Sequence, residues 1–304
     1  MLAVKLVCLC SKSINRNLDE IRLGGVPEHF NLPIHLALEE KAFQEDGVNV
    51  KWTDFDGGTG QMTEALRNND IDVCVLLTEG IVSDILKGNK SKIISGYVKS
   101  PLTWGIHSGV ENTLDKHREI YDKQYAISRL GSGSHLMAIV DALDKDVHLK
   151  EEQFTIVNNL NGALDSLNRL DTDVFYWEKF TTKPYVVKGD LKKIGEFVTP
   201  WPCFMMAASE QVLAEKPKVV SKMLRIINKT CAQFMEKENA IDLVSQRYGI
   251  DAKDAAKWYH ATEWATDGWV SNKMLKNVVY TLKEAGIIPE IVDTNHLIWQ
   301  RNRI

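Results

Sequence analysis

A short segment that follows an apolar run contains side chains able to hold a small molecule: Glu28, His29, Phe30 and Asn31. A carboxylate accepts hydrogen bonds, a neutral imidazole donates and accepts them, and a phenyl ring stacks on planar ligands. The alternative for this segment is a solvated turn that caps the next helix. We predict that these residues contact a ligand.

Two glycine-containing turns each precede a stretch with helical periodicity. Glycine lets a ligand approach the backbone, and the first turn of a helix offers unpaired N–H groups to an anion. The turn that contains Gly131 and Gly133 matches neither a P-loop nor a G-x-G-x-x-G motif, and plain helix capping is its alternative. The candidate ligand-binding residues from these turns are Gly58, Thr59, Gly60, Ser128, Gly131, Ser132, Gly133 and Ser134.

Polar or aromatic residues also follow three other apolar segments. Ligands of open α/β sheets bind beyond the carboxyl ends of strands, which makes Thr78, Glu79, Trp177 and Glu178 candidate contacts. Thr78 and Glu79 could instead cap a helix and place an acid in its first turn. Trp201 is a candidate for stacking on the ligand, with packing at a chain crossing as the alternative.

No motif in the sequence indicates a metal site or catalysis. His35 and Glu39 are spaced as neighbours on a helix, but two groups do not make a zinc site. Neither G-x-S-x-G nor H-E-x-x-H occurs. Glu28 and Glu79 disfavour a simple inorganic anion as ligand, because two nearby carboxylates would repel it. We therefore expect no metal, no cofactor and no catalytic residue.

The 304 residues include 37 Lys+Arg and 41 Asp+Glu, a net charge of −4. This balance does not support binding to nucleic acid, and no stretch approaches the ~18 apolar residues of a membrane span. The five cysteines show no disulfide pattern and fit a reducing compartment. We predict a cytoplasmic location, with an organelle or the periplasm as alternatives, and a flexible N-terminal segment over residues 1–18.

Short apolar runs alternate with amphipathic stretches, which predicts βαβ units and mostly parallel sheets. One block of such units ends near residue 98, a second covers residues 102–198, and an almost wholly helical tail follows. Prolines near residues 100 and 200 suit extended crossings between two lobes. Expected strands are 21–25, 48–55, 71–77, 92–98, 102–107, 124–128, 153–157, 174–177, 191–198 and 203–208. Expected helices include 33–46, 61–68, 217–235, 252–265 and 272–285.

Several segments resemble the type II periplasmic binding proteins, in particular the nitrate, taurine and alkanesulfonate binders, whose fold is shared by the fungal thiamin-pyrimidine synthases. The resemblance covers about residues 20–300. It is most specific in GGVPEHF from Gly24, PIHLALE from Pro33, DGGTG from Asp56 and NDIDV from Asn69. It implies two α/β lobes joined by two strands, with the ligand at the hinge. Lobe 1 would comprise residues 19–99 and 203–304, and lobe 2 residues 100–202.

The sequence departs from the synthases of this group. By alignment, Leu76 and Gly80 occupy the places of a lysine and a histidine, and Cys203 stands alone where the synthases carry a cysteine cluster. A non-catalytic binder of a small polar ligand, anionic or heteroaromatic, is therefore favoured. The alternatives are a diverged enzyme of thiamin-pyrimidine biosynthesis and a sensor that binds a partner protein. No sequence feature identifies such a partner.

Overall fold

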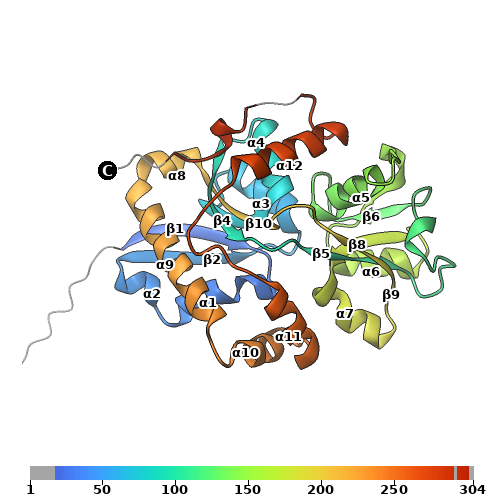
Figure 1. The fold of residues 1–304 in the computed structure, drawn as a ribbon, viewed down its shortest axis with the longest axis horizontal. Coiled ribbons are helices and arrows are strands. Elements are labelled where there is room, and N and C mark those ends of the chain that lie inside the picture. The colour runs from blue at the N-terminus through green and yellow to red at the C-terminus, as the bar shows by residue number, and fades with distance from the viewer. Residues whose placement is uncertain (1–17, 291–292, 301–304) are drawn as a thin grey trace, which may run out of the picture.

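The computed structural model describes residues 18–290 and 293–300. The flexible segment predicted over residues 1–18 lies outside the described residues apart from Leu18. Two separate five-stranded sheets, each with helices packed on it, form two lobes (Figure 1). The α/β two-lobed fold predicted from the sequence is thereby confirmed.

The first sheet has the strand order β2-β1-β3-β10-β4, in which only β10 is antiparallel to its neighbours. Strand β3 consists of apolar residues that are all buried, as expected for a central strand covered on both faces. The strands are β1 (Asp19–Gly25), β2 (Val48–Asp54), β3 (Val73–Leu77), β4 (Ser91–Val98) and β10 (Phe204–Ser209).

Helices of the first lobe follow its parallel strands. They are η1 (His29–Asn31), α1 (Leu32–Glu39), α2 (Ala42–Glu45), α3 (Gly58–Arg67) and α4 (Thr78–Leu86). The single helix predicted over residues 33–46 is wrong, because Lys41 adopts a left-handed conformation with φ of 59° and separates α1 from α2.

The second sheet repeats this plan with the order β7-β6-β8-β5-β9, in which β5 is the antiparallel strand. Its strands are β5 (Thr103–Ser108), β6 (Tyr125–Ile127), β7 (Phe154–Ile156), β8 (Val174–Glu178) and β9 (Lys192–Val198). Its helices are η2 (His117–Glu119), α5 (Gly133–Leu143), η3 (Glu151–Gln153), α6 (Leu160–Asn168) and α7 (Lys179–Lys188). Helix α7 was not predicted from the sequence.

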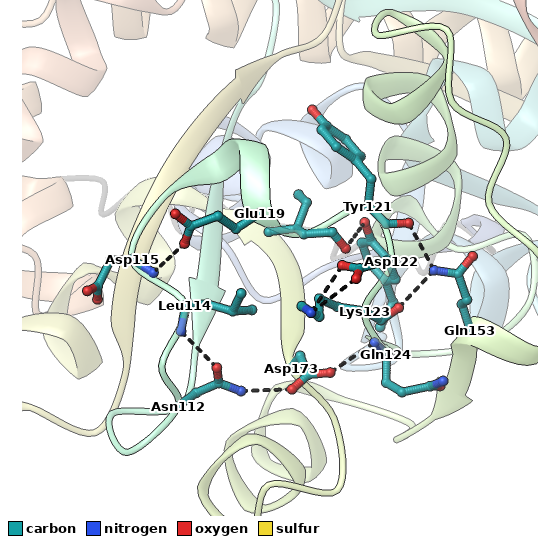
Figure 2. A network of polar contacts seen from close by, with 12 residues as sticks. Asn112, Leu114, Asp115, Glu119, Tyr121, Asp122, Lys123, Gln124, Gln153 and Asp173 are labelled. Carbon is teal, nitrogen blue, oxygen red and sulfur yellow. Dashed lines mark hydrogen bonds and ion pairs between the residues drawn. The ribbon is translucent and has the colours of Figure 1, made fainter.

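Hydrogen bonds fix the long connection between β5 and β6 (Figure 2). The side chain of Asn112 donates to Asp173 at 2.8 Å, and Asp173 accepts the backbone N–H of Gln124 at 3.0 Å. The amide of Gln153 donates to the carbonyl oxygens of Tyr121 and Lys123. These residues lie at the amino ends of β6, β7 and β8, so the network stabilises the edge of the sheet opposite its carboxyl ends.

The C-terminal part is helical, as predicted, and packs mainly on the first lobe. Its elements are α8 (Glu210–Glu215), α9 (Pro217–Met235), α10 (Ala240–Tyr248), α11 (Ala252–Ala261), α12 (Asn272–Glu284) and η4 (Asn295–Leu297). Helix α9 buries apolar residues at spacings of three and four against α1, β1 and β2. Helices α11 and α12 also reach the second lobe, where they contact α7 and α5. Within the described ranges, no helix has the length and apolar character needed to cross a membrane.

The chain passes between the lobes twice, from β4 to β5 and from β9 to β10. The two connections lie side by side, since Cys203 N–H donates to Ser100 O at 3.1 Å and Thr199 N–H donates to Leu102 O at 2.9 Å. Two adjacent extended connections between lobes are the arrangement typical of a hinge.

Candidate ligand-binding site

A cavity of about 40 Å³ lies between the lobes at the carboxyl ends of β1, β3, β6 and β8. One buried water needs roughly 10–15 Å³ on this measure, so the space suits a molecule of only a few non-hydrogen atoms. Nine predicted site residues line it: Glu28, Gly58, Thr59, Ser128, Ser132, Gly133, Ser134, Trp177 and Glu178.

Two carboxyl groups enter this cavity from opposite lobes. Glu28 follows β1 of the first lobe, and Glu178 ends β8 of the second. Burial, together with the charge of Glu178, raises the pKa of Glu28 to about 8, although hydrogen bonds with Trp177 and Thr181 oppose the shift. Burial also raises the pKa of Glu178 to about 7, although its carboxylate accepts the Thr181 N–H at 2.7 Å. The two groups therefore favour a state with at least one proton at neutral pH.

His29 lies next to Glu178 but does not line the cavity. Its Nε2 is 3.8 Å from the Oε2 of Glu178 and has no hydrogen-bond partner among the described residues. The imidazole stacks on Phe30 with ring centroids 4.8 Å apart and meets Trp258 edge-on at 4.4 Å. Burial lowers the pKa of His29 to about 3, so the ring is neutral and contributes no positive charge to the cavity.

The starts of two helices face the cavity from opposite sides. Gly58 and Thr59 begin α3, and Gly133 and Ser134 begin α5. The hydroxyl side chains serve the local fold: Thr59 accepts the N–H of Leu77 at 3.2 Å, and Ser134 accepts the N–H of Ser128 at 3.0 Å. What the helix starts present to a ligand is therefore their backbone N–H groups and partial positive charge.

The remaining predicted residues lie around the cavity without lining it. Phe30 packs against Phe204, and Asn31 donates to the Val26 carbonyl oxygen at 2.8 Å. Gly60 and Gly131 instead line a separate groove between α3, α4 and α5. Their ligand contacts remain predictions.

Thr78, Glu79 and Trp201 meet at the second crossing. The hydroxyl of Thr78 donates to the Pro202 carbonyl oxygen, and the indole N–H of Trp201 donates to Glu79 at 2.8 Å. Burial raises the pKa of Glu79 to about 7. The arrangement matches the alternative weighed for Trp201, which is packing at a chain crossing.

Sequence reasoning missed the apolar wall of the cavity. This wall consists of Val26, Leu77, Leu102, Trp104 and Phe204. Leu77 and Phe204 belong to predicted strands, but an apolar run does not by itself show which of its residues faces a cavity. For Leu77 the sequence did offer one signal, its position directly before the predicted site residue Thr78.

The described part of the chain contains no cluster of three or more His, Cys, Asp or Glu side chains arranged to hold a metal ion. Cys74, Cys203 and Cys231 are free and buried, and burial raises the pKa of each thiol. Cys8 and Cys10 lie outside the described residues.

Two α/β lobes, a double crossing and a cavity between them define the class: the chain has the type II periplasmic-binding-protein fold. Residues 104–197 match a family model described as "Ca3427-like PBP". The Candida albicans CA3427 gene product, described as defining a new family with the generic periplasmic binding protein fold, is similar to this chain at 28% identity and a TM-score of 0.87. The similarity covers 94% of this chain and 97% of that one.

Bacterial binding proteins share the fold at lower identity. The alkanesulfonate-binding protein SsuA from Xanthomonas axonopodis is 13% identical with a TM-score of 0.74, covering 92% of this chain and 98% of that one. The nitrate-binding protein NrtA from Synechocystis is 13% identical with a TM-score of 0.68, covering 92% and 85%. No curated protein sequence matches the chain. The chain thus shares the fold of the type II periplasmic binding proteins, as the sequence resemblance indicated.

Proposed function

We propose that this protein binds one small polar molecule in the cavity between its lobes and that the lobes close around the molecule by movement at the double crossing. The observation that carries the proposal is the cavity itself, because residues of both lobes enclose it at strand ends, where α/β proteins bind ligands. Aromatic side chains in its wall, Trp104, Trp177 and Phe204, suit a planar or heteroaromatic ligand.

Calorimetric titration against a ligand panel tests this function. The panel comprises nitrate and short alkanesulfonates, taken from the names of similar proteins, together with aminopyrimidines and pyridoxal phosphate, heteroaromatic compounds that are larger than the cavity and could enter only if the lobes open. We expect at least one compound to release or absorb heat and to raise the melting temperature. The absence of both effects with every compound would remove the support for ligand binding.

A diverged thiamin-pyrimidine enzyme is the less favoured alternative. Burial and the nearby carboxyl of Glu79 raise the pKa of Cys203 well above its usual range, which disfavours a reactive thiolate. A histidine at Gly80 would also not fit, because a Cβ there would lie 2.3 Å from the side chain of Thr59. Expression in a thiamin-pyrimidine auxotroph discriminates: growth supports the enzyme, and failure with folded protein supports the binder.

The location of the protein stays a prediction. Two similar proteins, a sulfonate binder and a nitrate binder, are periplasmic by their names. They favour the periplasmic alternative over the cytoplasmic location expected from the cysteines. Cell fractionation followed by immunoblotting distinguishes the two.

A further inference from the structure

The cavity wall contains acidic side chains and no basic ones, which is the opposite of what binding of an anion requires. Glu28 and Glu178 both line the cavity and are at most 9% exposed. The lining residues include no lysine, arginine or histidine. The positive contributions come from the starts of α3, α5 and α7, where Glu178 caps α7 through the N–H of Thr181.

The groups packed around Glu28 and Glu178 do not neutralise the negative charge of these two carboxyls. On the side of Glu178 are the neutral His29, the thiol of Cys203 and the carboxyl of Glu79, which interacts with that thiol. Glu28 also interacts with the buried phenol of Tyr248. Lys179 stabilises the charge of Glu178 only weakly, since its Nζ pairs with Glu196 at 2.9 Å on the outer face. Arg129 pairs instead with Glu64, outside the cavity.

Two ionised carboxylates amount to two full negative charges, while each helix start supplies only about half a positive charge in its first turn. The pair can therefore be balanced either by a proton on one carboxyl or by a positively charged group between them. His29 Nε2 adds a polar atom that is directed at the same carboxylate at 3.8 Å and has no hydrogen-bond partner among the described residues.

We infer that the cavity takes a small monocation with N–H donors, of the amidinium or protonated aminoheterocycle class, which binds between the carboxylates of Glu28 and Glu178. A proton that the cation displaces from either carboxyl passes to solvent, so charge is conserved in the cavity. This inference rests on the proposed ligand-binding function and deepens it.

The wall of the cavity suits the same ligand class. Trp104, Trp177 and Phe204 offer aromatic surface to a delocalised cation, which such faces attract. A sulfonate or nitrate would instead meet two carboxyls with no basic side chain among the lining residues. On this inference the protein differs in ligand charge from the similar proteins named for sulfonate and nitrate.

An isosteric series tests the inference. Acetamidinium, acetamide and acetate have the same size and planar shape but carry charges of plus one, zero and minus one. Each is titrated at pH 7 and millimolar concentration, because ligands of so few atoms bind weakly. We expect acetamidinium to bind about tenfold or more tightly than acetate. Titration in two buffers of different ionisation enthalpy should show release of a proton on binding.

Variants assign the effect to the acid pair. Glu28→Gln keeps the shape and removes the charge, so it should weaken acetamidinium binding about tenfold and reduce proton release. Glu178→Gln should act in the same direction. Glu215→Gln, on the exposed end of α8, is the matched control and should leave both readouts unchanged. Circular dichroism verifies that each variant is folded.

The outcomes separate this inference from the function on which it rests. The cation inference is overturned if acetate binds more tightly than acetamidinium, or if the only compounds of the larger panel that bind are anions. Either result leaves the proposed ligand-binding function intact. Preferential binding of cationic members of either series supports it. No binding by any compound of either series removes both.

Discussion

Trp201 holds a buried carboxyl at the hinge. Its indole N–H reaches Glu79 Oε2 at 2.8 Å, while Glu79 Oε1 has no hydrogen-bond partner within residues 18–290 and 293–300. Trp201→Phe would leave both oxygens unpaired, so we expect the free energy of unfolding to fall by about 1–3 kcal/mol beyond any packing loss. Urea unfolding measures this difference.

A second background isolates the hydrogen bond at Trp201. In a Glu79→Met chain no carboxyl remains to be satisfied, so Trp201→Phe should cost markedly less there. Equal costs in the two backgrounds would show that the tryptophan acts through packing alone.

The buried carboxyls also predict how stability depends on pH. The pKa of Glu28 is about 8 in the folded chain against 4.5 for the free group, so between these values the folded state holds a proton that the unfolded state has lost. Stability contributed by this proton is present at low pH and is lost as pH rises through 8. Glu178 and Glu79, with pKa values of about 7, act in the same direction.

Histidines oppose this trend only at lower pH. His29 and His107 have lowered pKa values of about 3 and 4, so their neutral folded forms lose stability as pH falls below about 6.5. Between pH 7 and 8 the carboxyls dominate, and we expect Glu28 to account for a loss of about 1 kcal/mol. Urea midpoints of wild type and Glu28→Gln over this range test it. The urea midpoint of Glu28→Gln should depend less on pH than that of the wild type. Parallel curves of midpoint against pH would contradict the assignment of this effect to Glu28.

At the scale of elements, an ion pair joins helices of different lobes. Lys183 of α7 lies 3.6 Å from Asp254 of α11, which also has Lys257 at 3.8 Å on its own helix. Lys183→Met should weaken binding of a cavity ligand about two- to fivefold at low salt, in keeping with partly exposed pairs. Lys257→Met is the matched control, because it breaks a pair within one helix. Calorimetry with the tightest panel ligand gives both values, and equal effects would exclude a role in lobe closure.

The succession of elements was predictable where periodicity is strong. Strand β3 and helix α9 lie close to their predicted ranges, because the buried apolar residues of each follow a regular pattern along the sequence. Helix α7 was missed because Pro184 interrupts it and its apolar residues do not form one face. The break at Lys41 was missed because a left-handed lysine has no sequence signature.

At the scale of the molecule, two chain crossings determine which residues meet. Sequence patterns placed Glu28 and Glu178 at strand ends, but only the tertiary arrangement brings them into one cavity. The same arrangement buries Glu79 against Trp201, and it places Gly60 and Gly131 in the lining of another groove. Strand-end rules thus identify the edge of the sheet at which the cavity lies, while the facing lobe determines which residues of that edge line it.

Close approach of the lobes depends on the absence of a side chain at Gly133. A Cβ at this first residue of α5 would lie 2.3 Å from Leu77 of the first lobe and 2.6 Å from Trp104. The backbone of Gly133 does not have a positive φ, so alanine is compatible with its local conformation. Gly133→Ala should therefore act as a wedge that opens the lobes without unfolding either.

We expect the wedge to increase the radius of gyration measured by small-angle scattering and to weaken ligand binding about tenfold or more, while the circular dichroism spectrum is unchanged. The added methyl group would lie 2.3 Å from the end of the Leu77 side chain in a densely packed contact, so either that side chain shifts or the lobes move apart. Adding Leu77→Ala removes the nearest obstacle and should restore part of the compaction. If Gly133→Ala matched wild type in both radius and affinity, closure at this contact would not be what holds the ligand.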